Sequence, residues 1–311
     1  MALKDTWVNR VDGVDLNSAD DINQVAQAVI ELEKIGIGTA IEDSIVTRNI
    51  TGYSNDRVTS IGAYIFSACS LLKNANFPNA TFIGAYAFFG CTGLSDVNIP
   101  KARNIEHDAF YRCESLTNVD FPNVVSIGEE AFMYCSGLET ISLPNAITIS
   151  NNAFLECSGL TSVDCPNAIT IGDKGFSDCR NLSDISFPKV KSIGAEAFHD
   201  CVSLTNVDLP SVETIEVAAF AYCNGLKTVR TSANTIKNSA FYACRNLTDI
   251  YLTSPTVCTL ESTIAFQYTP FTGYPTDDGK EGTIYVPASL LSQYKSATNW
   301  SAFVGKIKAY D

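Results

Sequence analysis

Large apolar residues return along this chain at an almost constant interval, and this interval dominates its pattern of hydrophobic and polar positions. Nine phenylalanines follow one another in steps of 22 residues, except for a last step of 21, and a cysteine stands three residues after each. These are Phe66, Phe88, Phe110, Phe132, Phe154, Phe176, Phe198, Phe220 and Phe241. A period of this length is typical of a solenoid, in which each repeat packs on its two neighbours. The sequence therefore predicts a stack of nine like turns over residues 58–257.

Each repeat contains a short alternating segment that predicts a β-strand. In the copy that begins at Phe110, Val119 and Phe121 are apolar, while Asn118 and Asp120 are polar. Alternation with period two is that of a half-buried strand, so the apolar pair points inward and the polar pair outward. Proline directly follows this segment in seven copies, where its missing N–H would end the strand. Stacking then predicts a parallel sheet with ladders of like side chains.

The remainder of the repeat predicts a corner and a return arm. The Ile-Gly pair, for example Ile127-Gly128, is interpreted as the corner. Glu106 and Ser150 stand at the glycine position in other copies, so most copies need no positive φ there. The Ala-Phe-x-x-Cys segment predicts a helical or irregular arm on the opposite side, with its alanine, phenylalanine and cysteine facing inward.

The first 57 residues lack the repeat and predict an N-terminal cap. A capping box begins at Ser18, and apolar residues at helical spacing then predict a helix over residues 19–34. Residues 41–57 predict a degenerate half-repeat with Ile50 and Tyr53 inward and a turn that starts at Tyr53.

Residues 258–311 predict an irregular last repeat and a C-terminal cap. Phe266 keeps the repeat signature, with threonine in place of cysteine, and predicts a tenth turn. A turn-rich insertion and a closing strand follow. Pro287 is placed in the first turn of a helix whose buried face is formed by Leu290, Leu291 and Tyr294. An apolar lid is predicted from Trp300, Phe303 and Ile307.

The repeat carries a family resemblance. The motif Phe-x-x-Cys-x-x-Leu-x-x-Val-x-Leu/Ile/Phe-Pro-x-Val/Ala-x-x-Ile-Gly resembles the BspA-type leucine-rich repeat family of bacterial proteins. This resemblance implies an α/β fold, a right-handed leucine-rich-repeat solenoid with a parallel sheet on its concave face and helical caps at both ends. It also implies a cell-surface or secreted adhesion or recognition protein without catalytic activity, although no signal peptide is visible in this chain.

The net charge of the chain, its apolar runs and its sequence motifs limit the classes of partner and of activity that we expect. The formal net charge of −13 disfavours nucleic acid and anionic lipid, which both require clustered lysine and arginine. No apolar run approaches the length of a membrane span, so membrane insertion is not expected. The sequence contains neither a nucleotide-binding motif nor a nucleophile motif. His107 and His199 have no serine or aspartate partner at a spacing typical of a catalytic site. We therefore expect no enzymatic activity and no cofactor.

The eleven cysteines are interpreted as reduced, buried thiols. Nine occupy one repeat position, and Cys165 takes a strand position that holds phenylalanine or leucine elsewhere. Buried free cysteine behaves as a small hydrophobe. Neighbouring turns would bring cysteines within disulfide range, so bridges stay open as an alternative, although nine equivalent residues do not pair evenly. A zinc site is a weaker interpretation because no Cys-x-x-Cys occurs. No metal is expected.

Two rows of outward side chains are predicted on the sheet, and acids are never adjacent within a row. A plain solvated face needs this spacing, because like charges on neighbouring strands repel. A groove of hydroxyl, amide and carboxylate groups that binds a glycan or a basic protein surface is the functional alternative. Tyr251 is the sole outward aromatic in these rows, which counts against a glycan. The candidate binding residues are Asp96, Asn98, Asn118, Asp120, Asp164, Asp184, Asp208, Arg230 and Tyr251.

Aromatic residues supply two further candidates. Tyr268, Phe271 and Tyr274 in the C-terminal insertion predict an exposed cluster that either binds a partner or anchors the loop. A stripe along the return arm is either packing between turns or a contact surface. It comprises Phe89, Tyr111, Met133, Tyr134, Tyr222 and Tyr242.

The leading hypothesis is a non-catalytic recognition or adhesion protein that binds a protein or glycan on a cell surface. One alternative is a phage or prophage tail-associated receptor-binding protein, because the opening around Thr6 to Val25 weakly resembles such proteins. The other alternative is a purely structural spacer.

Overall fold

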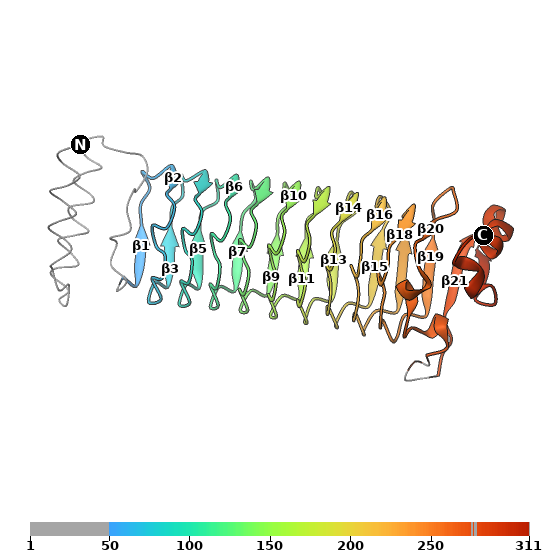
Figure 1. Ribbon diagram of the computed structural model, residues 1–311. Coiled ribbons are helices and arrows are strands. Elements are labelled where there is room, and N and C mark those ends of the chain that lie inside the picture. The colour runs from blue at the N-terminus through green and yellow to red at the C-terminus, as the bar shows by residue number, and fades with distance from the viewer. Residues whose placement is uncertain (1–49, 275, 277–278, 311) are drawn as a thin grey trace.

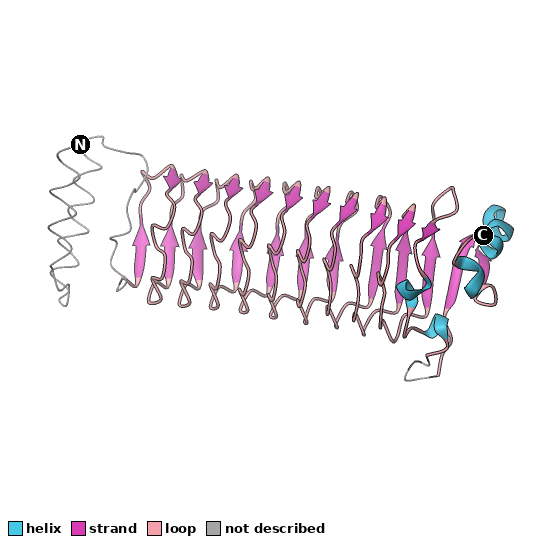
Figure 2. Ribbon diagram, in the orientation of Figure 1, coloured by secondary structure: helices cyan, strands magenta, loops and turns pink. Residues whose placement is uncertain are grey.

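The computed structural model is one continuous row of turns, with the strands of successive turns side by side along its length (Figure 1). It describes residues 50–274, 276 and 279–310. Each regular turn carries one long strand and one strand of two residues (Figure 2). The short strands form one ten-stranded parallel sheet, and the long strands form three successive parallel sheets of three, four and five strands. The predicted parallel-sheet solenoid with a 22-residue repeat is confirmed.

The long strands lie side by side along the row as the alternating segments predict (Figure 1), and their three parallel sheets are together called the long-strand sheet. Their partners lie 22 residues apart in the middle of the stack, so Val163 pairs with Ile141 on one side and Ile185 on the other. All pairings in this sheet are parallel. The long strands are β1 (Gly52–Ser54), β3 (Asn74–Asn76), β5 (Asp96–Asn98), β7 (Asn118–Asp120), β9 (Thr140–Ser142), β11 (Ser162–Asp164), β13 (Asp184–Ser186), β15 (Asn206–Leu209), β17 (Thr228–Thr231), β19 (Asp249–Leu252), β21 (Thr283–Pro287) and β22 (Ile307–Tyr310).

The predicted corner at the Ile-Gly pair is wrong, because the isoleucine belongs to a second, short strand. Ile149 is fully buried and pairs in register with Ile127 and Ile171. The glycine after it has no positive φ, as predicted, and the Gly128 N–H donates to a carbonyl of the previous turn. The short strands are β2 (Ser60–Ile61), β4 (Phe82–Ile83), β6 (Asn104–Ile105), β8 (Ser126–Ile127), β10 (Thr148–Ile149), β12 (Thr170–Ile171), β14 (Ser192–Ile193), β16 (Thr214–Ile215), β18 (Thr235–Ile236) and β20 (Thr259–Leu260).

The return arm is irregular and turns through residues in the left-handed conformation. Glu130 and Tyr134 have φ of 57° and 63°, and equivalent residues of the other turns have similar values. A left-handed residue other than glycine costs about 1–2 kcal/mol. The N–H groups of Glu130, Phe132 and Tyr134 offset this cost by donating to carbonyls of the next turn at 2.8–3.1 Å. Among the described residues, helix is therefore confined to segments after the last regular turn.

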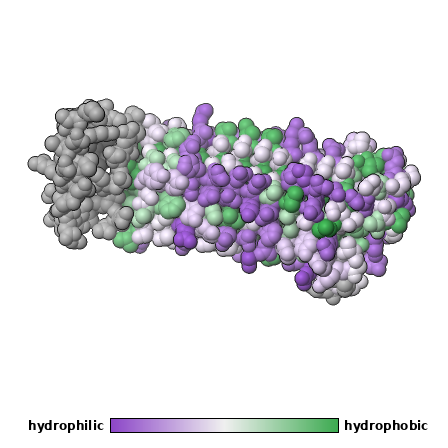
Figure 3. Space-filling model, in the orientation of Figure 1, coloured by the Kyte–Doolittle hydropathy of each residue, from purple (hydrophilic) through white to green (hydrophobic). Residues whose placement is uncertain are grey.

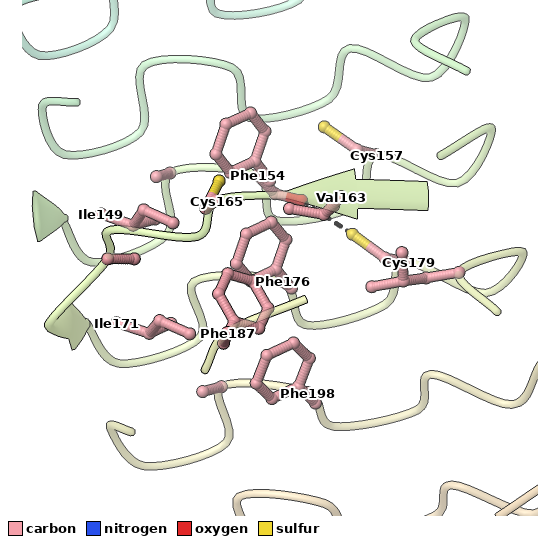
Figure 4. Close-up of a cluster of buried hydrophobic side chains, with 14 of the residues drawn as sticks. Ile149, Phe154, Cys157, Val163, Cys165, Ile171, Phe176, Cys179, Phe187 and Phe198 are labelled. Carbon is pink, nitrogen blue, oxygen red and sulfur yellow. Dashed lines mark hydrogen bonds between the residues drawn. The ribbon is translucent and has the colours of Figure 1, made fainter. Parts of the chain in front are cut away.

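A ladder of phenylalanine rings fills the core. Phe154 and Phe176 lie 5.0 Å apart between ring centroids, and their planes differ by 2° (Figure 4). Neighbouring rings from Phe66 to Phe266 repeat this stacking at 5.0–5.6 Å. Phe266 closes the ladder against Phe241, which confirms the predicted tenth turn.

All eleven cysteines are free thiols with buried side chains. The Cys179 thiol donates to the carbonyl oxygen of Phe154 in the previous turn at 3.2 Å (Figure 4). Eight cysteines make this bond, at 2.9–3.2 Å, so the sulfur ladder joins neighbouring turns by hydrogen bonds. Cys165 lies in the core at the strand position where other turns place phenylalanine or leucine.

The C-terminal end closes with short helices and two more strands of the long-strand sheet. The predicted burial of Tyr294, Trp300, Phe303 and Ile307 is confirmed. Pro287 ends β21 and is the N-cap residue of the 3-10 helix that leads into α3, so it lies one residue before the helical turn in which it was predicted. The helical segments are η1 (Thr263–Phe266), η2 (Pro270–Thr272), η3 (Ala288–Leu290), α3 (Leu291–Ser296) and η4 (Trp300–Phe303).

At the N-terminal end, the helix predicted over residues 19–34 and the segment that resembles tail-associated proteins lie outside the described residues. Ile50 and Tyr53 pack against the core as predicted. Tyr53 lies within β1 and pairs with Ala75, so the turn predicted to start at Tyr53 is wrong.

Trp300 fixes the C-terminal cap to the last turns. Its indole N–H donates to the Cys258 carbonyl at 2.6 Å, and its ring lies against Phe266 and Tyr294. We expect Trp300→Ala to destabilise this end by about 3–5 kcal/mol, through the lost burial and the unpaired carbonyl. Hydrogen exchange should accelerate over residues 258–310 and stay unchanged over residues 120–200, because a solenoid can open from one end. Trp300→Phe, which keeps an aromatic ring, is the milder control. Even acceleration along the chain would contradict this view of the cap.

Candidate functional site

The long-strand face, defined as the outward side chains of the long strands, carries the two predicted rows. In the second row, Asp120 is in register with Ser142, and Ser142 with Asp164. Parallel strands lie roughly 4.8 Å apart, so one side chain of each row recurs at about that interval. The face is the one on which the candidate residues were expected, and they extend along the row of turns instead of gathering at one point.

The structure places eight of the nine candidates on this face as exposed residues, and Tyr251 as half-buried. The asparagines are engaged near the N-terminal end, where the Asn98 side-chain amide donates to Asn76 at 2.7 Å. Asn118 accepts from Thr140 at 3.1 Å. These amides bond to neighbouring turns, which supports a structural role for them.

The carboxylates of the second row remain available to bind a partner. Asp120, Asp164 and Asp208 alternate with Ser142 and Ser186, so a carboxylate stands on every second turn, roughly 10 Å from the next. None of these three carboxylates makes an ion pair or side-chain hydrogen bond with another described residue. They form a regular column of negative charge that faces solvent.

The C-terminal end of the long-strand face is aromatic. Arg230 is in register with Tyr251, and Tyr251 with Tyr285 of β21. The two tyrosine rings are stacked at 4.5 Å, and Tyr310 of β22 lies against Tyr251. Burial first, and then the neighbouring Tyr285, raise the pKa of Tyr251. The expectation of a single outward aromatic was therefore wrong, and Ile284-Tyr285 following the pattern of Ile250-Tyr251 was the signal for it.

The C-terminal insertion differs from its prediction at one residue. Phe271 is 4% exposed and packs edge to face on Phe266, so it anchors the loop and is not part of an exposed cluster. Tyr268 and Tyr274 are exposed, with ring centroids 6.0 Å apart. The guanidinium of Arg245 lies 5.4 Å from the centroid of Tyr274.

The return arms present a second surface, the turn face, on which the predicted aromatic stripe forms two columns. The first column combines rings of successive turns, and Tyr64 stacks on Tyr86 at 4.6 Å within it. Between the columns, Arg180 pairs with Asp178 at 3.0 Å and Asp200 at 2.7 Å. The first column is Tyr64, Tyr86, Phe89, Tyr111 and Tyr134. The second column is Tyr222, Tyr242, Tyr268 and Tyr274.

Few other groups that could catalyse a reaction or bind a metal lie close together in the part of the chain that the structure describes. His107 contacts Asp108 at 3.1 Å, and His199 lies against Tyr222, so the two histidines belong to separate places on the turn face. Within the described ranges, no three His, Cys, Asp or Glu side chains gather in an arrangement suited to a metal ion. The space-filling view shows a mainly hydrophilic surface over the repeats, with hydrophobic patches along the edge that carries the short strands (Figure 3).

This architecture, a row of 22-residue turns with parallel strands and stacked core ladders, defines a leucine-rich-repeat solenoid. The family model described as "BspA type Leucine rich repeat region (6 copies)" matches residues 59–182 and 147–272, which is more than half of the chain. The chain belongs to the BspA-type leucine-rich repeat family.

Solved structures show related repeat proteins. A leucine-rich repeat protein of T. pallidum is 28% identical, covers 51% of this chain and 79% of its own, and has a TM-score of 0.49. A leucine-rich cell surface protein of Faecalibacterium prausnitzii is 22% identical over 82% of both chains, with a TM-score of 0.37. A leucine-rich repeat protein of Bacteroides ovatus is 18% identical over 88% of this chain and 94% of its own, with a TM-score of 0.34.

A search of curated protein sequences gives no significant match. In the described part of the chain, no helix combines the length and the apolar character needed to cross a membrane.

Proposed function

We propose that this protein is a non-catalytic recognition protein that binds a macromolecule on a cell surface through its long-strand face. Membership of a repeat family related to bacterial surface proteins supports a protein-interaction role. The column formed by Asp120, Asp164 and Asp208 is the observation that carries the choice of face. A stack held by core ladders keeps such groups at fixed separations, so little ordering entropy is lost when a partner binds.

The charge of the column favours a basic protein surface as the partner. Three carboxylates at regular spacing attract lysine or arginine side chains, and electrostatic complementarity contributes specificity and association rate. The tyrosines at the C-terminal end of the face, next to Arg230, would add contact area. The net charge of −13 makes nucleic acid an unfavourable partner.

A charge-neutral variant of the column tests this proposal. We expect Asp120→Asn/Asp164→Asn/Asp208→Asn to weaken binding to a cell-surface or matrix protein, identified from an array, by about tenfold. Binding is measured by surface plasmon resonance at physiological salt. Asp56→Asn/Glu114→Gln/Glu213→Gln removes the same charge from exposed residues elsewhere and should bind within about twofold of the wild type.

Two outcomes would speak against the long-strand face. Equal loss in both triple variants would assign the effect to net charge alone. A wild-type protein that binds nothing on cells, protein arrays or glycan arrays would favour the structural-spacer alternative.

A further inference from the structure

The first aromatic column on the turn face is placed where solenoid packing does not require aromatic residues. Tyr64, Tyr86 and Tyr134 all have positive φ, of 61°, 58° and 63°. Bulky residues are unusual in this conformation, which asparagine, aspartate and glycine adopt more readily. Asn152 and Asp178 occupy the same repeat positions in the middle of the stack. Polar residues therefore satisfy the turn, and the tyrosines need another explanation.

These rings lie outside the phenylalanine ladder and remain accessible. Tyr64 is 51% exposed, and the other four rings of the first column are half-buried. Tyr64 stacks on Tyr86 with planes 9° apart, and Phe89 stacks on Tyr111 at 4.7 Å with planes 6° apart. Tyr111 meets the Tyr134 ring edge to face. The column is a continuous aromatic strip over four turns.

The orientation of the rings favours one class of partner. Because neighbouring rings cover each other's faces, the strip presents mainly ring edges and hydroxyl groups to solvent. Stacking of a sugar ring requires an open aromatic face, which this strip offers poorly. Tyrosine edges and hydroxyls instead suit a protein partner, for which tyrosine supplies rigid amphipathic contact area.

Carboxylates border the strip and define the charge of the partner. Asp108, Glu129 and Glu130 stand on the turns that carry Tyr111 and Tyr134. Burial, followed by the charges of Asp108 and Glu129, raises the pKa of Glu130. The charge of Asp108 is the main cause of the raised pKa of Tyr86. Negative potential therefore extends over this end of the turn face.

The chain itself shows that a guanidinium fits beside these rings. Arg112 lies with its guanidinium carbon 5.3 Å from the centroid of Tyr134. Because the stacked rings cover each other's faces, an arginine from a partner would meet ring edges, hydroxyl groups and the bordering carboxylates Asp108, Glu129 and Glu130.

We propose that the first aromatic column, with Asp108, Glu129 and Glu130, docks a basic, arginine- or lysine-rich segment of a partner protein. This surface lies on the return arms, apart from the long-strand face, and the two proposals stand independently. The second column also carries an arginine, Arg245 against Tyr274, but its rings meet edge to face without the stacked pairs of the first column, so it serves as the comparison surface.

A labelled twelve-residue peptide of alternating arginine and glycine is the probe, titrated with the full chain by fluorescence anisotropy at physiological salt. Tyr64→Asn/Tyr86→Asn/Tyr134→Asn keeps residues that favour positive φ, so the turns should fold. We expect this variant, and Glu129→Gln/Glu130→Gln, to weaken peptide binding at least about tenfold. Tyr222→Asn/Tyr268→Asn makes the same change at left-handed positions of the second column and should alter binding by less than about twofold.

Three results would overturn the proposal. Equal weakening by both sets of tyrosine variants would show that the first column is not the site. Loss of peptide binding in the Asp120/Asp164/Asp208 variant alone would move the basic segment to the long-strand face and leave the proposed function intact. A wild-type protein that prefers a neutral glycan, with that preference lost in the first tyrosine variant, would make the strip a glycan surface.

Discussion

Raising the pH above 9 will destabilise this protein steeply, because burial raises the pKa of ten of its thiols. Burial raises the pKa of Cys135 and Cys165 to about 12, and that of Cys157 and Cys201 well above its ordinary value. Thiols of the unfolded chain ionise near pH 9, while those of the folded chain keep their protons. Unfolding then releases protons, so the stabilisation is complete below pH 9 and decreases as the pH rises toward 12.

The size of the effect follows from the number of thiols. Each one lowers the free energy of unfolding by about 1.4 kcal/mol per pH unit within this interval. Urea denaturation followed by circular dichroism between pH 7 and 10.5 measures it, with reductant present. Cys165→Val keeps an apolar side chain and should reduce the slope by one thiol. A urea midpoint that stays constant from pH 8 to 10.5 would contradict the buried sulfur ladder.

Phe154→Ala should be the most damaging single truncation of the core. Phe154 is fully buried and stacks on Phe132 at 5.1 Å and Phe176 at 5.0 Å. Removing a buried phenylalanine ring costs about 3–5 kcal/mol, from lost burial and the cavity left behind. Because each turn contacts only its neighbours, a cavity in a central turn also weakens the coupling between the two halves of the stack. We expect a lower urea midpoint and a broader transition.

A conservative variant provides the control for this truncation. Phe154→Leu retains most of the buried volume and should cost less than half as much. Wild-type midpoints in both variants would mean that the ring stack contributes little to stability, and that the short-strand and long-strand ladders hold the turns without it.

The periodicity of the sequence was enough to predict the long-strand sheet and its core ladders. Alternation at Val119 and Phe121 assigned inward residues correctly, since a fixed step of 22 residues places them in register. The short strands were missed because two residues contain one inward side chain, too few to show alternation. Only the repetition of Ile127 and Ile149 marked them, and a single buried isoleucine per turn is also compatible with a corner.

The left-handed residues of the return arm were missed for a different reason. Glu130, Lys174 and Tyr134 carry no signal for positive φ, because such side chains usually adopt right-handed or extended backbone. The signal lay in other copies of the same positions, where Gly90, Asn152 and Asp178 occur. A comparison of the repeats column by column would have found it.

The long-strand face was predicted residue by residue, whereas its C-terminal end was not. Tyr285 joins Tyr251 only because the chain returns to the sheet after an insertion that interrupts the period. Phe271 was expected outside because polar and turn-forming residues surround it. Its ring instead packs against the last turn, a tertiary contact that local sequence does not encode.

Every regular turn presents the same packing surface to the next turn, because the strands, the core phenylalanine ring and the cysteine sulfur occupy equivalent positions in each. A gene that gained or lost one 66-nucleotide unit would therefore encode a protein with both ends unaltered and all junctions already compatible. The molecule would lengthen or shorten in increments of roughly 4.8 Å, the separation of adjacent parallel strands. The length of the solenoid would then be an inheritable trait, adjustable by recombination between repeats without any new packing arrangement.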